Sequence, residues 1–244
     1  MSNKSDKKNY IVTGANSGIG YMCAEALLEQ GNRIIGIDYH DENMKQLQLR
    51  FKDSFSFAIK DLSQDIDKLP DFITELKNQF GCFSGMVCCA GISNIQPLRA
   101  LDFAILQKMM AINFYAPLFL AKGFCKKENN CGTLSSIVLI ASAAAVKNDK
   151  GQISYSASKA AASAAFRCLA REVSSSKIRV NIISPVDVKT PMMEELNKYR
   201  NFDPNRYPLG VMEPKDVVDF ILFLLSDKTT KISCQNYILD CGVL

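Results

Sequence analysis

Short apolar runs alternate with longer amphipathic segments along almost the whole chain. The runs have the length of buried strands, and the segments between them repeat their apolar residues at helical spacing. The clearest helix carries Leu69, Ile73, Leu76 and Phe80 on one face. Strands that alternate with helices are joined by right-handed crossovers and form a parallel sheet with helices on both faces.

The pattern therefore predicts an α/β fold, a doubly wound parallel sheet of the Rossmann type with three α/β/α layers, in a single domain spanning residues 1–244. The predicted strands are 10–13, 33–38, 55–60, 85–90, 136–141, 178–183 and 236–240. The predicted helices are 19–30, 41–50, 66–80, 101–125, 155–173 and 216–225. The proline-rich segment 185–214 is predicted to be mainly loop with one short helix. Since such long loops are often lids, we expect 186–214 to be the substrate loop.

The composition of the 244 residues excludes several classes of protein. With 48% apolar and 22% charged residues, the chain is neither disordered nor fibrous. A formal net charge of +4 does not favour nucleic acid or a membrane as partner. No run reaches the ~18 apolar residues of a membrane span, and the polar N-terminus lacks a signal-peptide core. We therefore expect a cytoplasmic protein that acts on a small molecule.

The nine cysteines are predicted to be free thiols. Their number is odd and the chain carries no export signal, so we expect small buried residues rather than disulfides. No metal site is predicted either. The adjacent pair Cys88 and Cys89 lacks the spacing of metal ligands, and His40 is the only histidine.

A glycine-rich turn joins the first predicted strand to the first predicted helix. Its residues are Thr13-Gly14-Ala15-Asn16-Ser17-Gly18-Ile19-Gly20. Glycines permit a sharp turn and close approach of a ligand, and the free N–H groups at a helix start favour a pyrophosphate. The spacing GxxxGxG differs from the general dinucleotide fingerprint, and an ordinary tight turn is the alternative. The position of the turn after the first strand favours a dinucleotide site.

Asp38 ends the second predicted strand. A carboxylate there can accept hydrogen bonds from the adenosine ribose and would repel a 2′-phosphate. A basic residue that binds this phosphate would be expected at position 39 or in the glycine turn at position 17. These positions hold Tyr39 and Ser17, and neither residue is basic. NAD(H) is therefore predicted over NADP(H). The alternative is that Asp38 merely caps the helix that starts near Asp41.

Tyr155 and Lys159 lie four residues apart in the helical sequence YSASK and so share one helical face. A nearby cation favours the phenolate, and we expect Lys159 to hold the pKa of Tyr155 well below its ordinary value of about 10. Such a phenol can give a proton to a carbonyl oxygen or take one from an alcohol. A core tyrosine beside a solvated lysine is the alternative for this pair taken alone.

Together, the glycine turn, Asp38 and YSASK resemble the short-chain dehydrogenase/reductase family of the classical type, from about Tyr10 to Gly242. The resemblance implies that Tyr155 is the general acid or base and that Lys159 also binds the nicotinamide ribose. It assigns Ser142 to the reacting oxygen and Asn113 to a proton relay through water. The family's reaction is hydride transfer between nicotinamide and a carbonyl–alcohol pair.

The resemblance also implies a set of cofactor-binding residues. Asp61-Leu62 matches the family pair that contacts adenine, and Ala90-Gly91 matches the end of its NNAG strand. The segment 185–190 matches PGxVxT, whose valine and threonine hold the carboxamide. The full set is Gly14, Asn16, Ser17, Gly18, Ile19, Gly20, Asp38, Asp61, Leu62, Ala90, Gly91, Tyr155, Lys159, Pro185, Val188 and Thr190.

Three positions depart from the family pattern. The two asparagines of NNAG are Cys88 and Cys89, so the bracing of the central sheet must come from another group. The glycine of PGxVxT is Val186, which would crowd the nicotinamide end, and Cys241 replaces the first glycine of a C-terminal DGG. None of the three belongs to the proton-transfer set.

These features predict an NAD(H)-dependent oxidoreductase acting on a secondary alcohol or ketone. A 3-oxoacyl carrier-protein reductase, a sugar-modifying reductase, and a non-catalytic dinucleotide sensor on the same fold are the alternatives. The two long helices carry many small and apolar residues, which suits a self-complementary interface. In the family these helices form a dimer bundle, so a homodimer or homotetramer is expected.

Overall fold

The computed structural model describes residues 7–132, 134–147 and 149–243. The first six residues of the basic N-terminal segment lie outside the described residues. The strands are β1 (Asn9–Thr13), β2 (Arg33–Asp38), β3 (Phe55–Ile59), β4 (Gly85–Cys88), β5 (Ser136–Ile140), β6 (Arg179–Pro185) and β7 (Asn236–Leu239). The helices are α1 (Gly18–Glu29), α2 (Glu42–Phe51), α3 (Leu69–Phe80), α4 (Phe103–Met110), α5 (Ala116–Phe124), α6 (Ile153–Glu172), α7 (Pro191–Asn197) and α8 (Pro214–Leu225).

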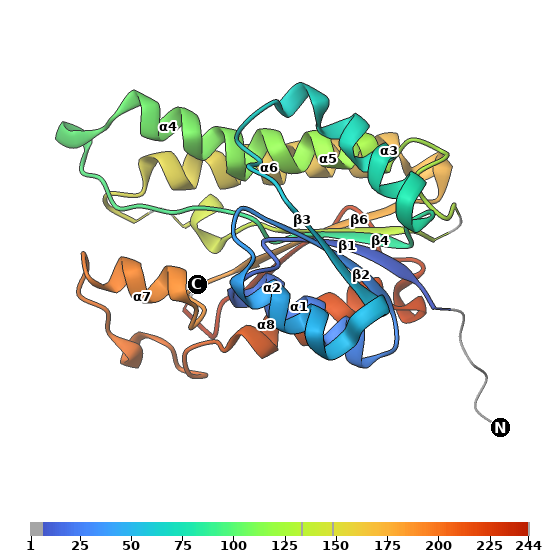
Figure 1. Cartoon of the computed structure of the whole chain (residues 1–244). Coiled ribbons are helices and arrows are strands. Elements are labelled where there is room, and N and C mark those ends of the chain that lie inside the picture. The colour runs from blue at the N-terminus through green and yellow to red at the C-terminus, as the bar shows by residue number, and fades with distance from the viewer. Residues whose placement is uncertain (1–6, 133, 148, 244) are drawn as a thin grey trace.

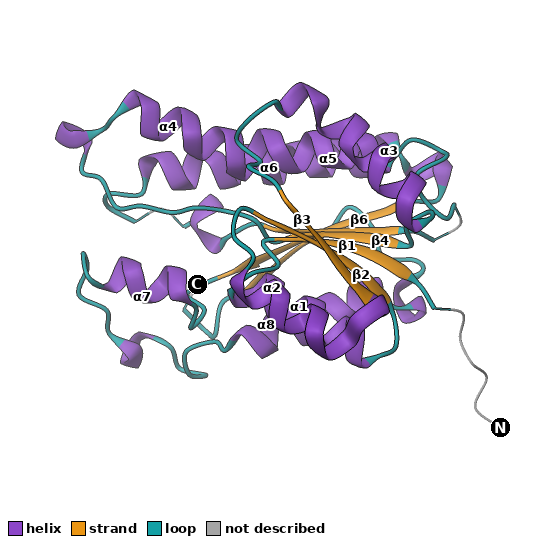
Figure 2. Cartoon of the chain, in the orientation of Figure 1, coloured by secondary structure: helices purple, strands orange, loops and turns teal. Residues whose placement is uncertain are grey.

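All described strands pair in parallel, in the order β3-β2-β1-β4-β5-β6-β7. The order reverses between β1 and β4, as in a doubly wound sheet. Figure 2 shows the strands as one central layer between two layers of helices. The predicted three-layer α/β/α fold is thus confirmed.

Alternating strand side chains supply the cores of the two layers, because successive residues of a strand point to opposite faces. In β1, Ile11 packs with α3, α5 and α6, whereas Val12 packs with α1, α2 and α8. In Figure 1 these two groups of helices lie above and below the sheet. Both faces are buried, which explains why the strands are continuous apolar runs rather than alternating ones.

The predicted helix 101–125 is interrupted. A π-helical turn, Ala111–Tyr115, lies between α4 and α5, and Asn113 is in its middle. Helical periodicity in the sequence does not distinguish a widened turn from a regular one. Among the described residues, the composite helix Phe103–Phe124 is long and apolar enough to cross a membrane by length and composition alone. Its α4 half packs on α6 and its α5 half on α3, so it is part of the upper layer.

The proline-rich segment has the predicted character. It contains the seven-residue helix α7 and a short 3-10 turn, Pro204–Arg206, and is otherwise loop. The cysteine prediction is only partly right. Cys23 and Cys88 are buried, but Cys82, Cys131 and Cys168 are exposed. Composition cannot tell which small residues lie in surface loops.

Candidate active site

A cleft of about 530 Å³ opens at the carboxyl ends of the strands, where the strand order reverses between the paired strands β1 and β4. Ligands of doubly wound sheets bind at this place. Most of the predicted site residues line the cleft. These are Gly14, Ser17, Gly18, Ile19, Gly20, Asp38, Asp61, Leu62, Ala90, Gly91, Ser142, Tyr155, Lys159, Pro185, Val188 and Thr190. Asn16 and Asn113 are not among its lining residues.

The glycine turn is closely folded on itself. Gly14 has a φ of +70°, and a Cβ on Gly20 would lie 2.2 Å from the Gly14 carbonyl oxygen, so no other residue fits there. Ser17 and the first residues of α1 line the cleft, and the Ser17 side chain makes no capping hydrogen bond to any described residue. Uncapped N–H groups at a helix start bind phosphate, so the turn fits the pyrophosphate of a dinucleotide.

The Asn16 side chain is bonded to the start of α2, and cofactor binding by Asn16 stays a prediction. Its Oδ1 accepts hydrogen bonds from the amides of Asn43 (2.8 Å) and Met44 (3.2 Å), and its Nδ2 donates to Glu42. Asn16 thus caps α2 from across the turn. The sequence carries no signal for this role, because the capped helix starts 26 residues after Asn16.

Asp38 lies at the predicted position and does not cap α2. Its carboxylate accepts hydrogen bonds from the amides of Asn16 (3.0 Å), Tyr39 (2.7 Å) and His40 (3.3 Å). These three donors hold the carboxylate at the end of β2, on the wall of the cleft. The alternative of a simple helix cap is therefore excluded.

Asp61 follows β3 and lines the same end of the cleft. The amide and hydroxyl of Ser63 both donate to its Oδ1, at 2.9 and 2.7 Å. These bonds, led by that of the hydroxyl, lower the pKa of Asp61. The carboxylate is therefore ionised and fixed near the site expected for adenine.

Tyr155 and Lys159 share one face of α6, as predicted. The Lys159 Nζ lies 5.9 Å from the centroid of the Tyr155 ring. The Ser142 hydroxyl, at the end of β5, accepts a hydrogen bond from the amide of Ala144 (3.1 Å) and is within hydrogen-bonding reach of the Tyr155 phenol. Residues from two elements thus bring a phenol and a hydroxyl together at one point of the cleft.

The predicted direction of the Tyr155 pKa is wrong for this structure. Burial raises the pKa of the phenol above its ordinary value, the Ser142 hydrogen bond lowers it, and the charge of Asp187 raises it further. Burial penalises the phenolate, and the Lys159 ammonium donates its hydrogen bond elsewhere. The phenol is therefore protonated at neutral pH.

Lys159 is a buried cation, 5% exposed. Its Nζ donates to the carbonyl of Ile140, the last residue of β5, at 2.9 Å. Burial lowers the pKa of the ammonium to about 8. Since a Cβ on Gly91 would come within 3.3 Å of the Nζ, this glycine keeps the space in front of the ammonium open.

Asn113 does not line the cleft, and its side chain joins two segments that border the site. It is 1% exposed, and its Oδ1 accepts a hydrogen bond from the amide of Ile92 at 2.9 Å. Its Nδ2 donates to the Ile92 carbonyl (2.9 Å) and to the Ser158 hydroxyl (3.0 Å), which in turn donates to the Tyr155 carbonyl at 2.8 Å. Asn113 thus ties the chain after β4 to the first turn of α6. π-Helical turns are frequent at functional sites, which fits its place in one.

The cysteines that replace the NNAG asparagines point to opposite faces of the sheet, as adjacent strand residues do. Cys88 belongs to the core under α3, α5 and α6, and Cys89 packs against the core under α1 and α8. Thr13 supplies the bracing that they lack, because its Oγ1 accepts a hydrogen bond from the amide of Ala90 at 3.1 Å. Thr13 ends the first strand, and no motif in the sequence indicates this role.

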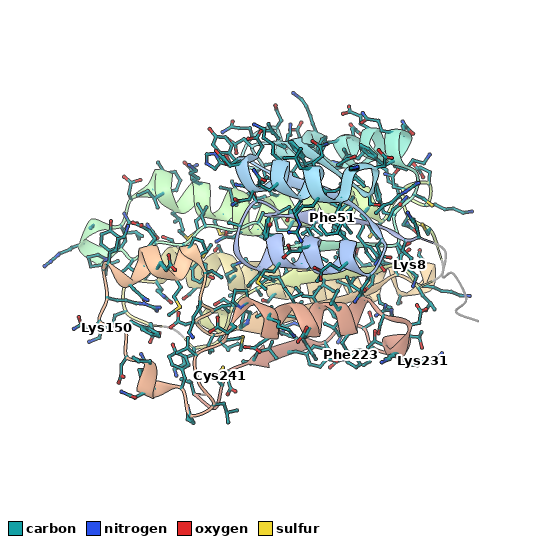
Figure 3. The ribbon with its side chains drawn as sticks, turned by 60° about the horizontal axis from the view of Figure 1, so that its bottom comes forward. Lys8, Phe51, Lys150, Phe223, Lys231 and Cys241 are labelled. Carbon is teal, nitrogen blue, oxygen red and sulfur yellow. The ribbon has the colours of Figure 1, made fainter. Side chains whose placement is uncertain are left out.

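The other two departures lie in or near the segment 186–214. Val186 lines the cleft and also packs against the core under α8. Cys241, labelled in Figure 3 near the C-terminal end, has a φ of +52°, so it keeps the backbone conformation that favours the family glycine. Its carbonyl accepts a hydrogen bond from the amide of Leu209 at 3.2 Å, which links the end of the chain to this segment.

A charged network lies in the segment 186–214. Arg200 donates to Asp187 at 2.8 Å, and the Tyr207 hydroxyl donates to the same carboxylate. All three residues line the cleft at the end that holds Tyr155. The network fixes the loop after α7 to the end of β6. The spacing of Asp187 and Tyr207 in the sequence gives no sign that their side chains form a hydrogen bond.

The comparisons with known proteins agree with this geometry. A family model described as Enoyl-(Acyl carrier protein) reductase matches residues 14–244. The chain belongs to the short-chain dehydrogenase/reductase family. This match confirms the resemblance inferred from the glycine turn and YSASK. The family supports an oxidoreductase.

Two relatives and one solved structure illustrate the family. The vibriobactin-specific 2,3-dihydro-2,3-dihydroxybenzoate dehydrogenase of Vibrio cholerae is 27% identical and covers 95% of this chain and 94% of its own. The 3-oxoacyl-[acyl-carrier-protein] reductase of Rickettsia felis is 29% identical, covering 97% of both chains. The structure of 4-hydroxyisoleucine dehydrogenase complexed with NADH has a TM-score of 0.89, at 27% identity over 97% of this chain and 98% of that one.

The lowered pKa of Lys159 gives a prediction for stability. Because the folded pKa (about 8) lies below the ordinary value of about 10.5, the folded protein holds fewer protons than the unfolded one between these pH values. Burial of the charged ammonium therefore lowers the free energy of unfolding by its full amount below pH 8. This loss disappears as the pH rises to about 10.5. Relative to Lys159→Met, the wild type should gain about 3 kcal/mol over this window in denaturant unfolding.

A direct titration completes this test. In protein labelled with ¹³C at lysine Cε, one resonance should titrate near pH 8, and Lys159→Met should abolish it. Titration of every lysine near 10 would show that the Lys159 ammonium is not desolvated.

Proposed function

We propose that this protein is an NAD(H)-dependent oxidoreductase that transfers a hydride between nicotinamide and a secondary alcohol or ketone. One observation carries the proposal. The Tyr155 phenol, the Ser142 hydroxyl and the Lys159 ammonium meet at one end of a cleft whose other end holds Asp38 and the uncapped start of α1. A proton donor and a dinucleotide-shaped cradle in one cleft fit this chemistry better than binding alone.

The cradle fits the cofactor residue by residue. The turn 13–20 would hold the pyrophosphate, Asp38 the adenosine ribose and Asp61 the adenine, whereas Lys159 would bind the nicotinamide ribose. When bound, the nicotinamide supplies the hydride donor or acceptor. The protein supplies position and proton transfer.

The protonated phenol suits the direction of reduction. Tyr155 gives its proton to the oxygen of the bound carbonyl group, and the Ser142 hydroxyl donates a second hydrogen bond to the same oxygen. The Lys159 ammonium, whose Nζ lies 5.9 Å from the ring centroid, carries a charge opposite to that of the phenolate that remains. Oxidation of an alcohol needs the phenolate first, whereas reduction starts from the protonated phenol.

A polar substrate fits the substrate end of the cleft. Lys147, Arg200 and Arg206 line it as cations, and Asp149 and Asp187 as anions. Two similar proteins, the 2,3-dihydro-2,3-dihydroxybenzoate dehydrogenase and the 4-hydroxyisoleucine dehydrogenase, are named for small polar molecules. We therefore favour a small polar substrate over a long acyl chain, handled in the cytoplasm. The 3-oxoacyl carrier-protein and sugar substrates stay as alternatives.

Tyr155→Phe tests the catalytic role. We expect turnover to fall by about 10²–10⁴-fold, because the general acid is lost, while the Kd for NADH changes less than about threefold. The assay follows NADH absorbance with a panel of keto acids, ketoses and 3-oxoacyl thioesters. Tyr237→Phe is the matched control, since Tyr237 is a phenol of β7 that does not line the cleft. Unchanged turnover in Tyr155→Phe would reject the role. NADH binding without turnover of any substrate would favour the sensor alternative.

Asp38→Ala tests the choice of cofactor. Without the carboxylate, the 2′-phosphate of NADPH meets no like charge at the end of β2, so the preference for NADH should fall by about 10- to 100-fold. Fluorescence titration with both cofactors measures the ratio. Asp41→Ala, an acid nearby that does not line the cleft, should leave it unchanged. Tighter binding of NADPH by the wild type would contradict our interpretation of Asp38.

We further propose a homodimer or homotetramer built on α4, α5 and α6. Phe103 (69% exposed), Tyr115 (41%) and Ile153 (45%) give this side of the molecule an apolar surface. Light scattering should give a mass two or four times the 27.1 kDa of the chain, and Phe103→Glu should lower it. Leu49→Glu, at an exposed position of α2, is the control. A wild-type mass of one chain would overturn this proposal.

A further inference from the structure

Two exposed thiols lie together at the edge of the sheet opposite the cleft. Cys82 comes between α3 and β4, and Cys131 between α5 and β5. Both therefore precede their strands, on the side from which the chain enters β1 in Figure 1. The sulfur atoms are 2.9 Å apart, although the residues are separated by 49 positions in the sequence.

The backbone holds the two cysteines in this arrangement. Phe83 and Asn130 form an isolated parallel bridge, in which the Phe83 amide donates to the Asn129 carbonyl (3.0 Å) and the Cys131 amide donates to the Phe83 carbonyl (2.9 Å). Phe83 is fully buried, which turns its neighbour Cys82 toward solvent. The bridge thus places Cys82 and Cys131 on the outer side of two paired segments.

The segment that carries Cys131 is itself anchored. The Asn129 Nδ2 donates to the carbonyl of Gly123 at 2.9 Å, and the Asn130 Nδ2 donates to those of Phe124 (3.1 Å) and Lys126 (2.9 Å). Both asparagines are buried and bind the free carbonyls at the end of α5. These contacts hold the Cys131 sulfur near the Cys82 sulfur without a covalent bond between them.

We propose that Cys82 and Cys131 form an intramolecular disulfide when the protein meets a low-molecular-weight disulfide such as oxidised glutathione. Closing 2.9 Å to a bond of about 2.05 Å needs a shift of less than about 1 Å. The anchored backbone also removes most of the entropy of bringing the thiols together. This is a modification site separate from the active site, because neither cysteine lines the cleft.

The exchange has two balanced steps. One cysteine thiolate attacks a sulfur of oxidised glutathione, forming a mixed disulfide and releasing one glutathione thiolate. The second cysteine sulfur then attacks the protein sulfur of the mixed disulfide, and the second glutathione thiolate leaves. Two protons pass from the protein thiols to the two glutathiones. The protein loses two electrons, and oxidised glutathione gains them.

The expected effect is on stability rather than catalysis. The bond would close a loop of 49 positions that contains β4, α4 and α5, which restricts the unfolded chain. A disulfide of this kind should raise the Tm by roughly 5–10 °C in a protein of this size. The Kd for NADH should stay unchanged, because the bond lies at the amino ends of the strands.

The experiment treats the full-length protein with oxidised glutathione, alkylates the remaining thiols and measures the intact mass. Free thiols should fall from nine to seven, with a mass loss of about 2 Da before alkylation and no glutathione adduct. Peptide mapping should find Cys82 joined to Cys131. Dithiothreitol should restore both thiols and the original Tm.

Matched variants separate this pair from the other thiols. Cys168→Ser removes an exposed cysteine of α6 and should leave the mass loss and the Tm gain intact. Cys82→Ser should abolish both and leave a glutathione adduct on Cys131 or no change. Alkylation of both Cys82 and Cys131 after oxidation would overturn the proposal. A bridge to another cysteine or between chains would overturn it as well.

Discussion

The Lys159 ammonium must sit in a place that water hardly reaches, and most of the site is arranged around that requirement. The cation is held by the carbonyl that ends β5, and it faces the space that Gly91 keeps free of a side chain. A buried cation without such a partner would be strongly unfavourable. The end of β5, Gly91 and helix α6 together fix the position of the Lys159 ammonium. They therefore also fix its distance from Tyr155.

Two buried side chains connect the surroundings of Lys159 to the rest of the fold through hydrogen bonds. Asn113, in its π-helical turn, connects the chain after β4 to α6 through Ile92 and Ser158. Thr13 connects β1 to the residue that follows Cys89. The proton-transfer groups and the dinucleotide cradle are thus joined through side chains from the central strands. A shift of either strand end would move both halves of the site.

Much of the fold could be predicted, because a parallel sheet with two covered faces needs continuous apolar strands and amphipathic helices in alternation. Tyr155, Lys159 and Asp38 could be predicted as well, since their positions follow from a helical repeat and a strand end. The π turn, the capping role of Asn16 and the Thr13 brace could not. Each depends on contacts between segments far apart in the sequence. The pKa of Tyr155 was mispredicted for the same reason, since burial is a property of the folded protein.

A crystal structure of the protein with NADH would show directly whether the buried Lys159 ammonium serves the dinucleotide. We expect electron density for the dinucleotide along the cleft, with its pyrophosphate on the start of α1 and a nicotinamide ribose hydroxyl on the Lys159 Nζ. The Tyr155 hydroxyl should face the nicotinamide ring. A dinucleotide bound elsewhere, or a Lys159 side chain turned away from the ribose, would contradict the account.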